Sequence, residues 1–149
     1  MVGTTTRSTG KYYFEVTATL FEGNAANSPL VGLASAATTF NTPWTSSGEM
    51  LWYCSGSSGV IIYSNNARLN YGLTAFVQGD VVGFAADLGA KLINFYRNGV
   101  AQGQLNIATY VPGVSSFWPC CSSPDAMNGA SAVDIPVSPK YLPAGYLPW

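Results

Sequence analysis

The side chains that most often perform acid–base and nucleophilic chemistry are scarce in this chain. It has no histidine among its 149 residues, which excludes Ser–His and Cys–His nucleophile pairs and removes the commonest general base and zinc ligand. Residues 56–59, Gly-Ser-Ser-Gly, lack the spacing of a nucleophile elbow and are interpreted as a turn. Neither a phosphate-binding loop nor a calcium-binding loop matches the sequence.

Seven carboxylates remain as candidate acids and bases, and a glycosidase needs only two of them close together. Asp80 and Asp87 bracket one expected strand, so we interpret both as structural. The other five are far apart in the sequence: Glu15, Glu22, Glu49, Asp125 and Asp134. We therefore expect a protein without enzyme activity, and a carbohydrate-active enzyme is the least favoured alternative.

The three cysteines indicate neither a disulfide framework nor a metal site. Cys54 stands alone, whereas Cys120 and Cys121 are adjacent. An odd number of cysteines suits a disulfide framework poorly, and this spacing does not match zinc ligands. We expect reduced thiols, folding in a reducing cytoplasm, and no metal or cofactor.

The composition predicts one folded domain over residues 1–149 with a weak electrostatic field. Hydrophobic residues make up 48% of the chain, but charged residues only 9%, with a net charge of −1. Soluble proteins have about 25% charged residues on average. Nucleic-acid binding requires clustered Lys and Arg, which are absent here, so we do not expect a nucleic-acid partner. We also expect no membrane insertion and no secretory signal, because no apolar run is long enough and the first residues are polar.

Hydrophobic periodicity predicts strands separated by Gly, Asn, Ser and Pro, and no helix longer than about two turns. The hairpin signal Asn98-Gly99 is the strongest turn signal, because a type I′ turn needs positive φ at both central residues. A second turn is expected at Leu88–Ala90. Strands are predicted at Tyr12–Leu20, Leu30–Ala36, Met50–Cys54, Val60–Tyr63, Val81–Asp87, Lys91–Arg97, Val111–Phe117 and Ala130–Val137. This spacing predicts an all-β antiparallel sandwich of two packed sheets.

Three long loops are predicted at Ala37–Gly48, Ser64–Gly72 and Trp118–Gly129. Aromatic side chains with polar tips beside Asn and Arg are typical of contact surfaces for peptides or sugars, and an Arg can bind a carboxylate through two parallel hydrogen bonds. An alternative is that part of the aromatics belong to the core and that the Arg is a plain surface residue. The candidate binding residues are Trp44, Tyr63, Asn65, Asn66, Arg68, Tyr71 and Trp118.

The stretch Phe95-Tyr96-Arg97-Asn98-Gly99 is preceded by Gly79-Asp80-Val81-Val82-Gly83. Together they resemble the core of SPRY domains and are the most specific of several matches to that family. Gly10–Val16 is similar to the opening strand of the family, and Tyr110–Ser115 to a late strand entered through a Pro. The ending Pro143–Trp149 resembles the Pro-x-Gly-aromatic-x-x-Trp that closes SPRY-like modules of bacteriophage proteins.

One region departs from the family pattern. Val133–Val137 stands where the family often has Asn-Phe-Gly, which leaves the strand pairing there open. A module excised from a longer polypeptide and an edge completed by a partner are both compatible with this departure.

The resemblance implies a SPRY-like antiparallel β-sandwich that binds partners through loops at one end. The expected function is a non-enzymatic binding module of a phage virion protein, of tail-fibre or adhesin type. Its ligand would be a protein or glycan on the host surface, or another virion protein. The alternative is a structural or decoration subunit that associates with copies of itself or packs on the capsid. The expected location is the virion, after synthesis in the cytoplasm of the host bacterium.

Overall fold

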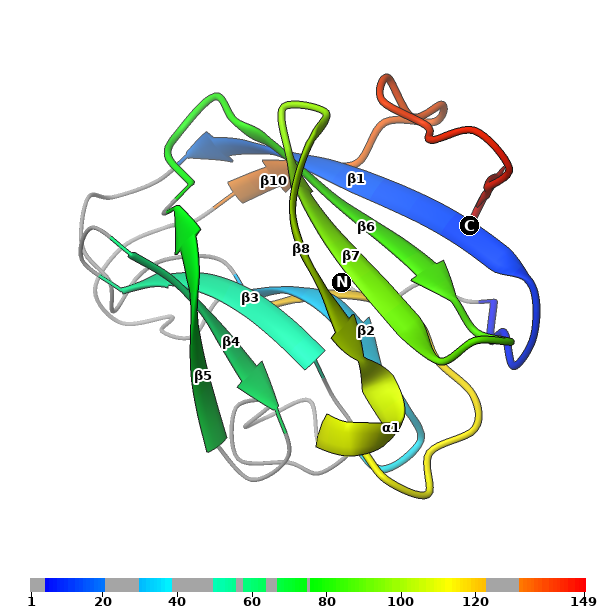
Figure 1. The fold of residues 1–149 in the computed structure, drawn as a ribbon. Helices are drawn as coiled ribbons and strands as arrows, with labels where there is room; N and C mark the ends of the chain where they lie inside the picture. The colour runs from blue at the N-terminus through cyan, green and yellow to red at the C-terminus, as the bar shows by residue number, and fades with distance from the viewer. Residues whose placement is uncertain are drawn as a thin grey trace.

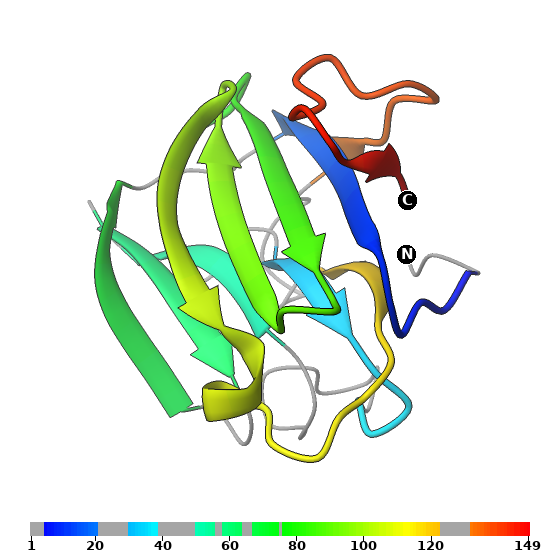
Figure 2. The same cartoon turned by 45° about the vertical axis from the view of Figure 1, so that its right-hand side comes forward.

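The computed structural model describes residues 5–20, 30–38, 50–55, 58–63, 67–74, 76–122 and 132–149. Within residues 50–74, and at residues 20, 122 and 132, it describes the backbone but not the side chains. Two sheets face each other (Figures 1 and 2). The six-stranded sheet has the order β10-β1-β6-β7-β8, with β11 also paired to β1. The five-stranded sheet has the order β5-β4-β3-β2-β9.

The strands of the six-stranded sheet are β1 (Lys11–Leu20), β6 (Val81–Asp87), β7 (Leu92–Arg97), β8 (Val100–Asn106), β10 (Ala132–Asp134) and β11 (Leu147–Pro148). Those of the five-stranded sheet are β2 (Leu30–Ala34), β3 (Met50–Ser55), β4 (Ser58–Tyr63), β5 (Ala67–Thr74) and β9 (Trp118–Ser122). Helix α1 (Ile107–Tyr110) has four residues. All pairings are antiparallel except that of β11 with β1. The predicted all-β sandwich is confirmed.

The core lies between the two sheets. Phe14 of β1 stacks on Phe84 of β6 with ring centroids 5.0 Å apart, and Phe84 meets the edge of Phe95 of β7 at 5.2 Å. These residues are direct neighbours across the sheet, and every second residue points to the same face. The three rings therefore form one continuous apolar layer.

The first six predicted strands are confirmed, with ends that differ by at most two residues. Ala130–Val137 contains a shorter strand, β10. The prediction of a strand at Val111–Phe117 is wrong, because α1 ends just before it and Pro112-Gly113 form a turn. In this stretch only Phe117 makes a bridge, to Arg7.

Two predicted loops contain strands instead. Strand β5 occupies most of Ser64–Gly72, where Leu69, Tyr71 and Leu73 alternate with polar residues in a pattern of period two. Strand β9 occupies the start of Trp118–Gly129. Its Pro119 is tolerated because β9 is an edge strand of the sheet, where a missing N–H costs little. Strand β8 was not among the predicted strands.

The carboxylate of Asp80 joins the turn before β6 to the β7–β8 hairpin. Oδ2 accepts hydrogen bonds from the backbone N–H of Val77 at 2.8 Å and from Nε of Arg97 at 2.7 Å. Oδ1 accepts from Nδ2 of Asn98 at 2.7 Å, and Asn98 Oδ1 accepts from the backbone N–H of Val81 at 2.8 Å. Asp80 is only 7% exposed, so its predicted structural role is confirmed.

The hairpin turn has the backbone conformation that the Asn-Gly sequence predicts. Asn98 has φ of 51° and Gly99 has φ of 80°. A Cβ on Gly99 would lie 2.6 Å from Cδ1 of Tyr141. Glycine is therefore needed for both its backbone freedom and its lack of a side chain.

The last segment of the chain covers the outer face of β1. Glu15 lies on that face and is only 2% exposed. Its Oε1 accepts from the backbone N–H of Lys140, and its Oε2 from the backbone N–H of Tyr141 at 3.1 Å and the hydroxyl of Tyr13 at 2.9 Å. Burial and the neighbouring Glu15 raise the pKa of Tyr13, so its hydroxyl remains a donor. Glu15 thereby fixes the C-terminal segment on the sheet.

We expect Asp80→Asn to destabilise the fold at neutral pH by about 1–3 kcal/mol, because buried donors lose a charged acceptor. Burial raises the pKa of the Asp80 carboxyl, but hydrogen bonds from Val77, Asn98 and Arg97 outweigh it and the pKa lies below its ordinary value of 3.8. The stabilisation is therefore present above pH 3.8 and declines as pH falls below that value through the folded-state pKa. Urea unfolding of both proteins between pH 7 and about pH 2 tests this. A stability difference that does not shrink in acid would contradict it.

Two glycine substitutions separate the effect of backbone strain at Gly99 from the effect of contact with a neighbouring side chain. Gly99→Val and Gly113→Val place the same side chain at nearly the same φ, 80° and 81°. Backbone strain should lower the free energy of unfolding of each variant by about 1–3 kcal/mol. Only Gly99→Val also collides with Tyr141, since no atom lies within 4 Å of a Cβ at Gly113. Denaturant unfolding should show the larger loss of stability for Gly99→Val. Equal losses of stability would show that the Tyr141 ring moves aside freely.

Candidate functional site

The carboxylates that the structure describes are mostly engaged in structural contacts. Glu15 and Asp80 accept hydrogen bonds as above, and Asp87 forms an ion pair with Lys11 at 3.1 Å. Within the described part of the chain no group of three or more His, Cys, Asp or Glu could hold a metal ion. Glu22, Glu49 and Asp125 lie outside the described residues. No pair of described carboxylates is therefore arranged for acid–base catalysis.

The described cysteines line the interior. Cys120 and Cys121 are buried, and neither is in a disulfide bond. Burial raises the pKa of the Cys121 thiol, which disfavours the nucleophilic thiolate. In the ranges described, the structure also contains no helix long and apolar enough to cross a membrane.

One end of the sandwich gathers three of the four predicted binding positions whose backbone the structure describes. Across the five-stranded sheet the register aligns Pro119, Leu33, Met50, Tyr63 and Ala67 in one row. This row contains the start of β9, the end of β2, the start of β3, the end of β4 and the start of β5. Helix α1 lies at the same end in both views (Figures 1 and 2). We refer to this end of the sandwich as the α1 end.

The predicted site residues occupy this end to different degrees. Tyr63 is the last residue of β4, Arg68 the second of β5, and Trp118 the first of β9, so all three backbones lie at or next to the α1 end. Tyr71 lies farther along β5, toward the opposite end. Nothing is described of the side chains of Tyr63, Arg68 and Tyr71, whereas Trp118 is half-buried.

Three further candidates lie outside the described residues: Trp44, Asn65 and Asn66. The strand ends that flank them in sequence are described. Ala34 and Met50 flank the segment with Trp44, and Tyr63 and Ala67 flank the two asparagines. All four flanking residues lie at the α1 end by register.

The third predicted loop, Trp118–Gly129, is not a single recognition loop. Trp118 lies at the α1 end, but β9 runs across the sheet to Ser122, which pairs with Leu30 at the opposite end. The chain therefore leaves β9 away from the α1 end. The loop was predicted to begin at Trp118, where the structure instead begins strand β9.

The structure adds residues to the α1 end that the sequence did not single out. A turn follows β2, in which Thr38 Oγ1 accepts from the N–H of Ser35 at 3.0 Å. Asn106 caps α1 by accepting from the N–H of Ala108 at 2.9 Å. A single helical turn is too short to show a 3.6-residue period, so only the Asn cap signalled it.

The described surface of the α1 end carries both charged and uncharged residues. Lys11 and Asp87 form an ion pair there, and Lys91 is partly exposed beside α1, where its backbone oxygen accepts from the N–H of Ile107 at 2.7 Å. Ala108, Pro112 and Gly113 are exposed and uncharged.

Comparison with known proteins identifies the fold family. The SPRY domain family model matches residues 11–132. The SPRY domain of human HERC1 is similar over 90% of this chain and 79% of its own, with a TM-score of 0.65 and 20% identity. The PSpry domain of TRIM65 is similar over 79% of this chain and 61% of its own, with a TM-score of 0.56 and 14% identity. No curated protein sequence matches the chain. Those structures share the fold, and since the family model covers most of the sequence, the chain belongs to the SPRY domain family.

Proposed function

We propose that the chain is a non-catalytic binding module of a bacteriophage virion protein. In this proposal the α1 end recognises a host-surface receptor or another virion protein. SPRY domains are generally protein–protein interaction modules, and no enzyme family is indicated for this chain. The observation that carries the proposal is the register of the five-stranded sheet, which brings Tyr63, Arg68 and Trp118 to one end.

The residue types and the strand pairing at the α1 end favour a binding role over a catalytic one. Trp and Arg are the commonest hot-spot residues of protein interfaces. The backbone around them is held by strand pairing on both β4 and β9, so little ordering entropy opposes association. The described carboxylates, by contrast, are used in hydrogen bonds and an ion pair that stabilise the fold.

The virion assignment rests on the ending Pro143–Trp149, which resembles that of phage modules. In this fold the ending closes the sheet edge. Pro148 pairs with Tyr13, and the indole of Trp149 packs against Phe14 at 6.1 Å and donates to the backbone oxygen of Thr5 at 3.0 Å. The structural role of the ending in this chain, together with its resemblance in sequence to the ending of phage modules, supports the proposed origin. Mass spectrometry of purified phage particles should find the protein, and its absence from particles would contradict the assignment.

The variant Trp44→Ala/Arg68→Ala/Trp118→Ala should bind host cells or purified virion proteins at least tenfold more weakly than the parent. Hot-spot residues are worth about 2 kcal/mol or more when central in an interface. Binding should change little between low and high salt, because the surface carries few charges. Biolayer interferometry on cell envelopes measures both effects.

A matched control is Val77→Ala/Val100→Ala, which removes exposed apolar side chains at the opposite end of the sandwich. It should bind like the parent. Circular dichroism and thermal unfolding must show that the triple variant is folded. Full binding by a folded triple variant would place recognition elsewhere on the molecule, and unfolding would assign these side chains to the core.

A further inference from the structure

The Asn98-Gly99 turn joins two residues that can react with each other. In an Asn-Gly sequence the backbone nitrogen of the glycine can attack the side-chain carbonyl carbon of the asparagine, because glycine has no side chain to hinder the approach. The chain has two such sequences, Asn98-Gly99 and Asn128-Gly129, and the second lies outside the described residues. Asn98 and Gly99 are both exposed, so water has access to the turn.

The reaction is a deamidation in two steps. In the first step a bond forms between the Gly99 nitrogen and Cγ of Asn98, and the bond from Cγ to Nδ2 breaks. The amide proton of Gly99 leaves with Nδ2 as ammonia, and a five-membered succinimide ring remains. In the second step water opens the ring at either carbonyl, which gives aspartate or isoaspartate at position 98. Water is the only co-reactant, and nothing is oxidised or reduced.

Two hydrogen bonds restrain the side chain of Asn98 in the folded protein. Its Oδ1 accepts from the backbone N–H of Val81 at 2.8 Å, and its Nδ2 donates to Oδ1 of Asp80 at 2.7 Å. The backbone N–H of Asn98 also donates to the carbonyl oxygen of Val81 at 2.8 Å. The attack must bring Cγ into bonding contact with the Gly99 nitrogen. A side chain bound at both polar atoms cannot move there until both bonds break.

The acceptor of this contact, Asp80, is itself held in place. The residue is only 7% exposed, and its Oδ2 accepts from Nε of Arg97 at 2.7 Å and from the backbone N–H of Val77 at 2.8 Å. The carboxylate therefore stays where it meets Nδ2 of Asn98.

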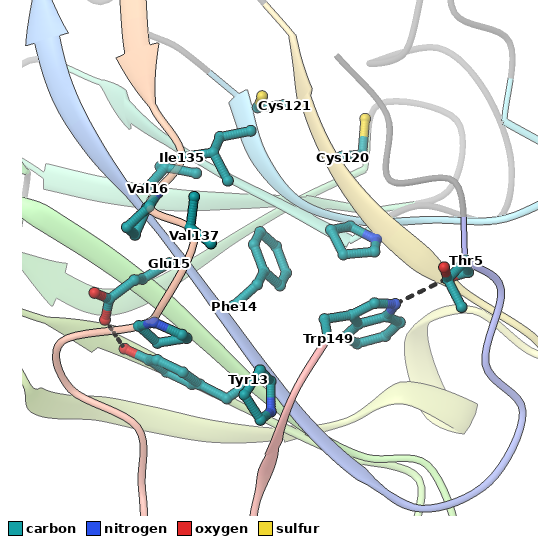
Figure 3. Close-up of a pocket in the computed structure, with 14 residues that line it drawn as sticks. Thr5, Tyr13, Phe14, Glu15, Val16, Cys120, Cys121, Ile135, Val137 and Trp149 are labelled. Carbon is teal, nitrogen blue, oxygen red and sulfur yellow. Dashed lines mark hydrogen bonds between the residues drawn. The ribbon is translucent and has the colours of Figure 1, made fainter.

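The turn can open without releasing the C-terminal segment that packs on it. The ring of Tyr141 lies against Gly99, but the backbone N–H of Tyr141 is bound to Oε2 of Glu15 at 3.1 Å. Figure 3 shows the Glu15 carboxylate bound by the hydroxyl of Tyr13 as well, at the wall of a pocket beside β1. These contacts do not involve Asn98, so opening of the hairpin end is a local event.

We propose that Asn98 is a site of spontaneous deamidation, and that its hydrogen bonds to Val81 and Asp80 set the rate. While both bonds are present, the turn is unreactive. When the end of the β7–β8 hairpin opens, Asn98 reacts as it does in an unfolded chain. This inference concerns the covalent chemistry of the hairpin. It goes beyond the proposed recognition role and does not depend on it.

Deamidation changes the contact that closes the turn. It replaces the Nδ2 donor by an oxygen, so that a carboxylate faces the carboxylate of Asp80 where a hydrogen bond of 2.7 Å stood. Like charges at such a distance repel. Isoaspartate also adds one carbon atom to the backbone path through the turn. Because ammonia is lost, the hairpin does not return to its original state, and the loss of stability is permanent.

Peptide mapping by mass spectrometry during incubation at mildly alkaline pH measures deamidation at each Asn-Gly sequence. In protein unfolded in guanidinium chloride, Asn98 and Asn128 should react at similar rates, because each is followed by glycine and the unfolded chain imposes no restraint. In the native parent, Asn98 should react at least about tenfold more slowly than in the unfolded protein, because two hydrogen bonds must break first.

Two substitutions should weaken the restraint while the protein remains folded. Asp80→Asn should raise the rate at Asn98 at least about fivefold, because Nδ2 loses its charged acceptor. Arg97→Lys removes the Nε that holds Asp80 and should raise the rate in the same direction. It is the milder change, and it replaces Asp80→Asn in the comparison if circular dichroism shows that Asp80→Asn is unfolded.

Two matched controls should leave the rate at Asn98 unchanged. Asp87→Asn removes a carboxylate at the other end of β6, where it accepts from the backbone N–H of Ala90 at 2.9 Å. Gly113→Val strains the backbone at the α1 end, at a φ of 81°. It lowers the overall stability without touching the hairpin.

The effect of the product is measured with Asn98→Asp. This variant should unfold at a lower guanidinium concentration than the parent at neutral pH. Asn106→Asp is the matched control, because that side chain accepts from the N–H of Ala108 at the start of α1. Aspartate caps a helix as well as asparagine does, so the control should be as stable as the parent.

Equal rates at Asn98 in native and unfolded protein overturn the proposal, because the contacts then give no protection. Absence of deamidation at Asn98 in the unfolded protein overturns it as well. Unchanged rates in folded Asp80→Asn and Arg97→Lys remove Asp80 from the account. Acceleration in Gly113→Val contradicts local opening, because global unfolding then exposes the turn. An Asn98→Asp protein as stable as the parent contradicts the effect assigned to the product.

Discussion

The buried carboxylate of Asp80 is the contact on which the arrangement of the six-stranded sheet depends. It accepts hydrogen bonds from donors in the turn before β6 and at the end of β7, and so fixes the Asn98-Gly99 turn. That turn leaves room for the ring of Tyr141. The backbone of Tyr141 in turn donates to Glu15 on β1. One chain of contacts therefore runs from the hairpin to the C-terminal segment and back to the first strand.

This organisation leaves two surfaces with different character. The α1 end combines strand ends and connecting segments on a rigid sheet, which is a common location for recognition residues. The side of the sandwich at β1 carries an apolar pocket and exposed aliphatic side chains held in place by Glu15.

Local sequence patterns predicted the parts of the fold that depend on neighbours in sequence. Asn98-Gly99 was sufficient to predict the tight turn, and the mostly apolar run Val81–Asp87 was sufficient to predict its strand. The burial of Glu15 was not visible, because its partners Lys140 and Tyr141 are more than a hundred residues away. For the candidate site, the end of β4 at Tyr63 was predicted correctly, but Trp118 begins a strand where a loop was expected, and the course of β9 depends on pairing with β2. Local propensity cannot show such pairing.

The central claim is that the chain acts by binding, through the α1 end. Hydrogen–deuterium exchange with and without host-cell envelope fragments measures this directly, peptide by peptide. The account predicts slower exchange in 35–38, 107–118 and the segments that join β2 to β3 and β4 to β5. Exchange should be unchanged at 77–80 and 98–100, at the opposite end. Protection confined to that opposite end, with none at the α1 end, would contradict the account.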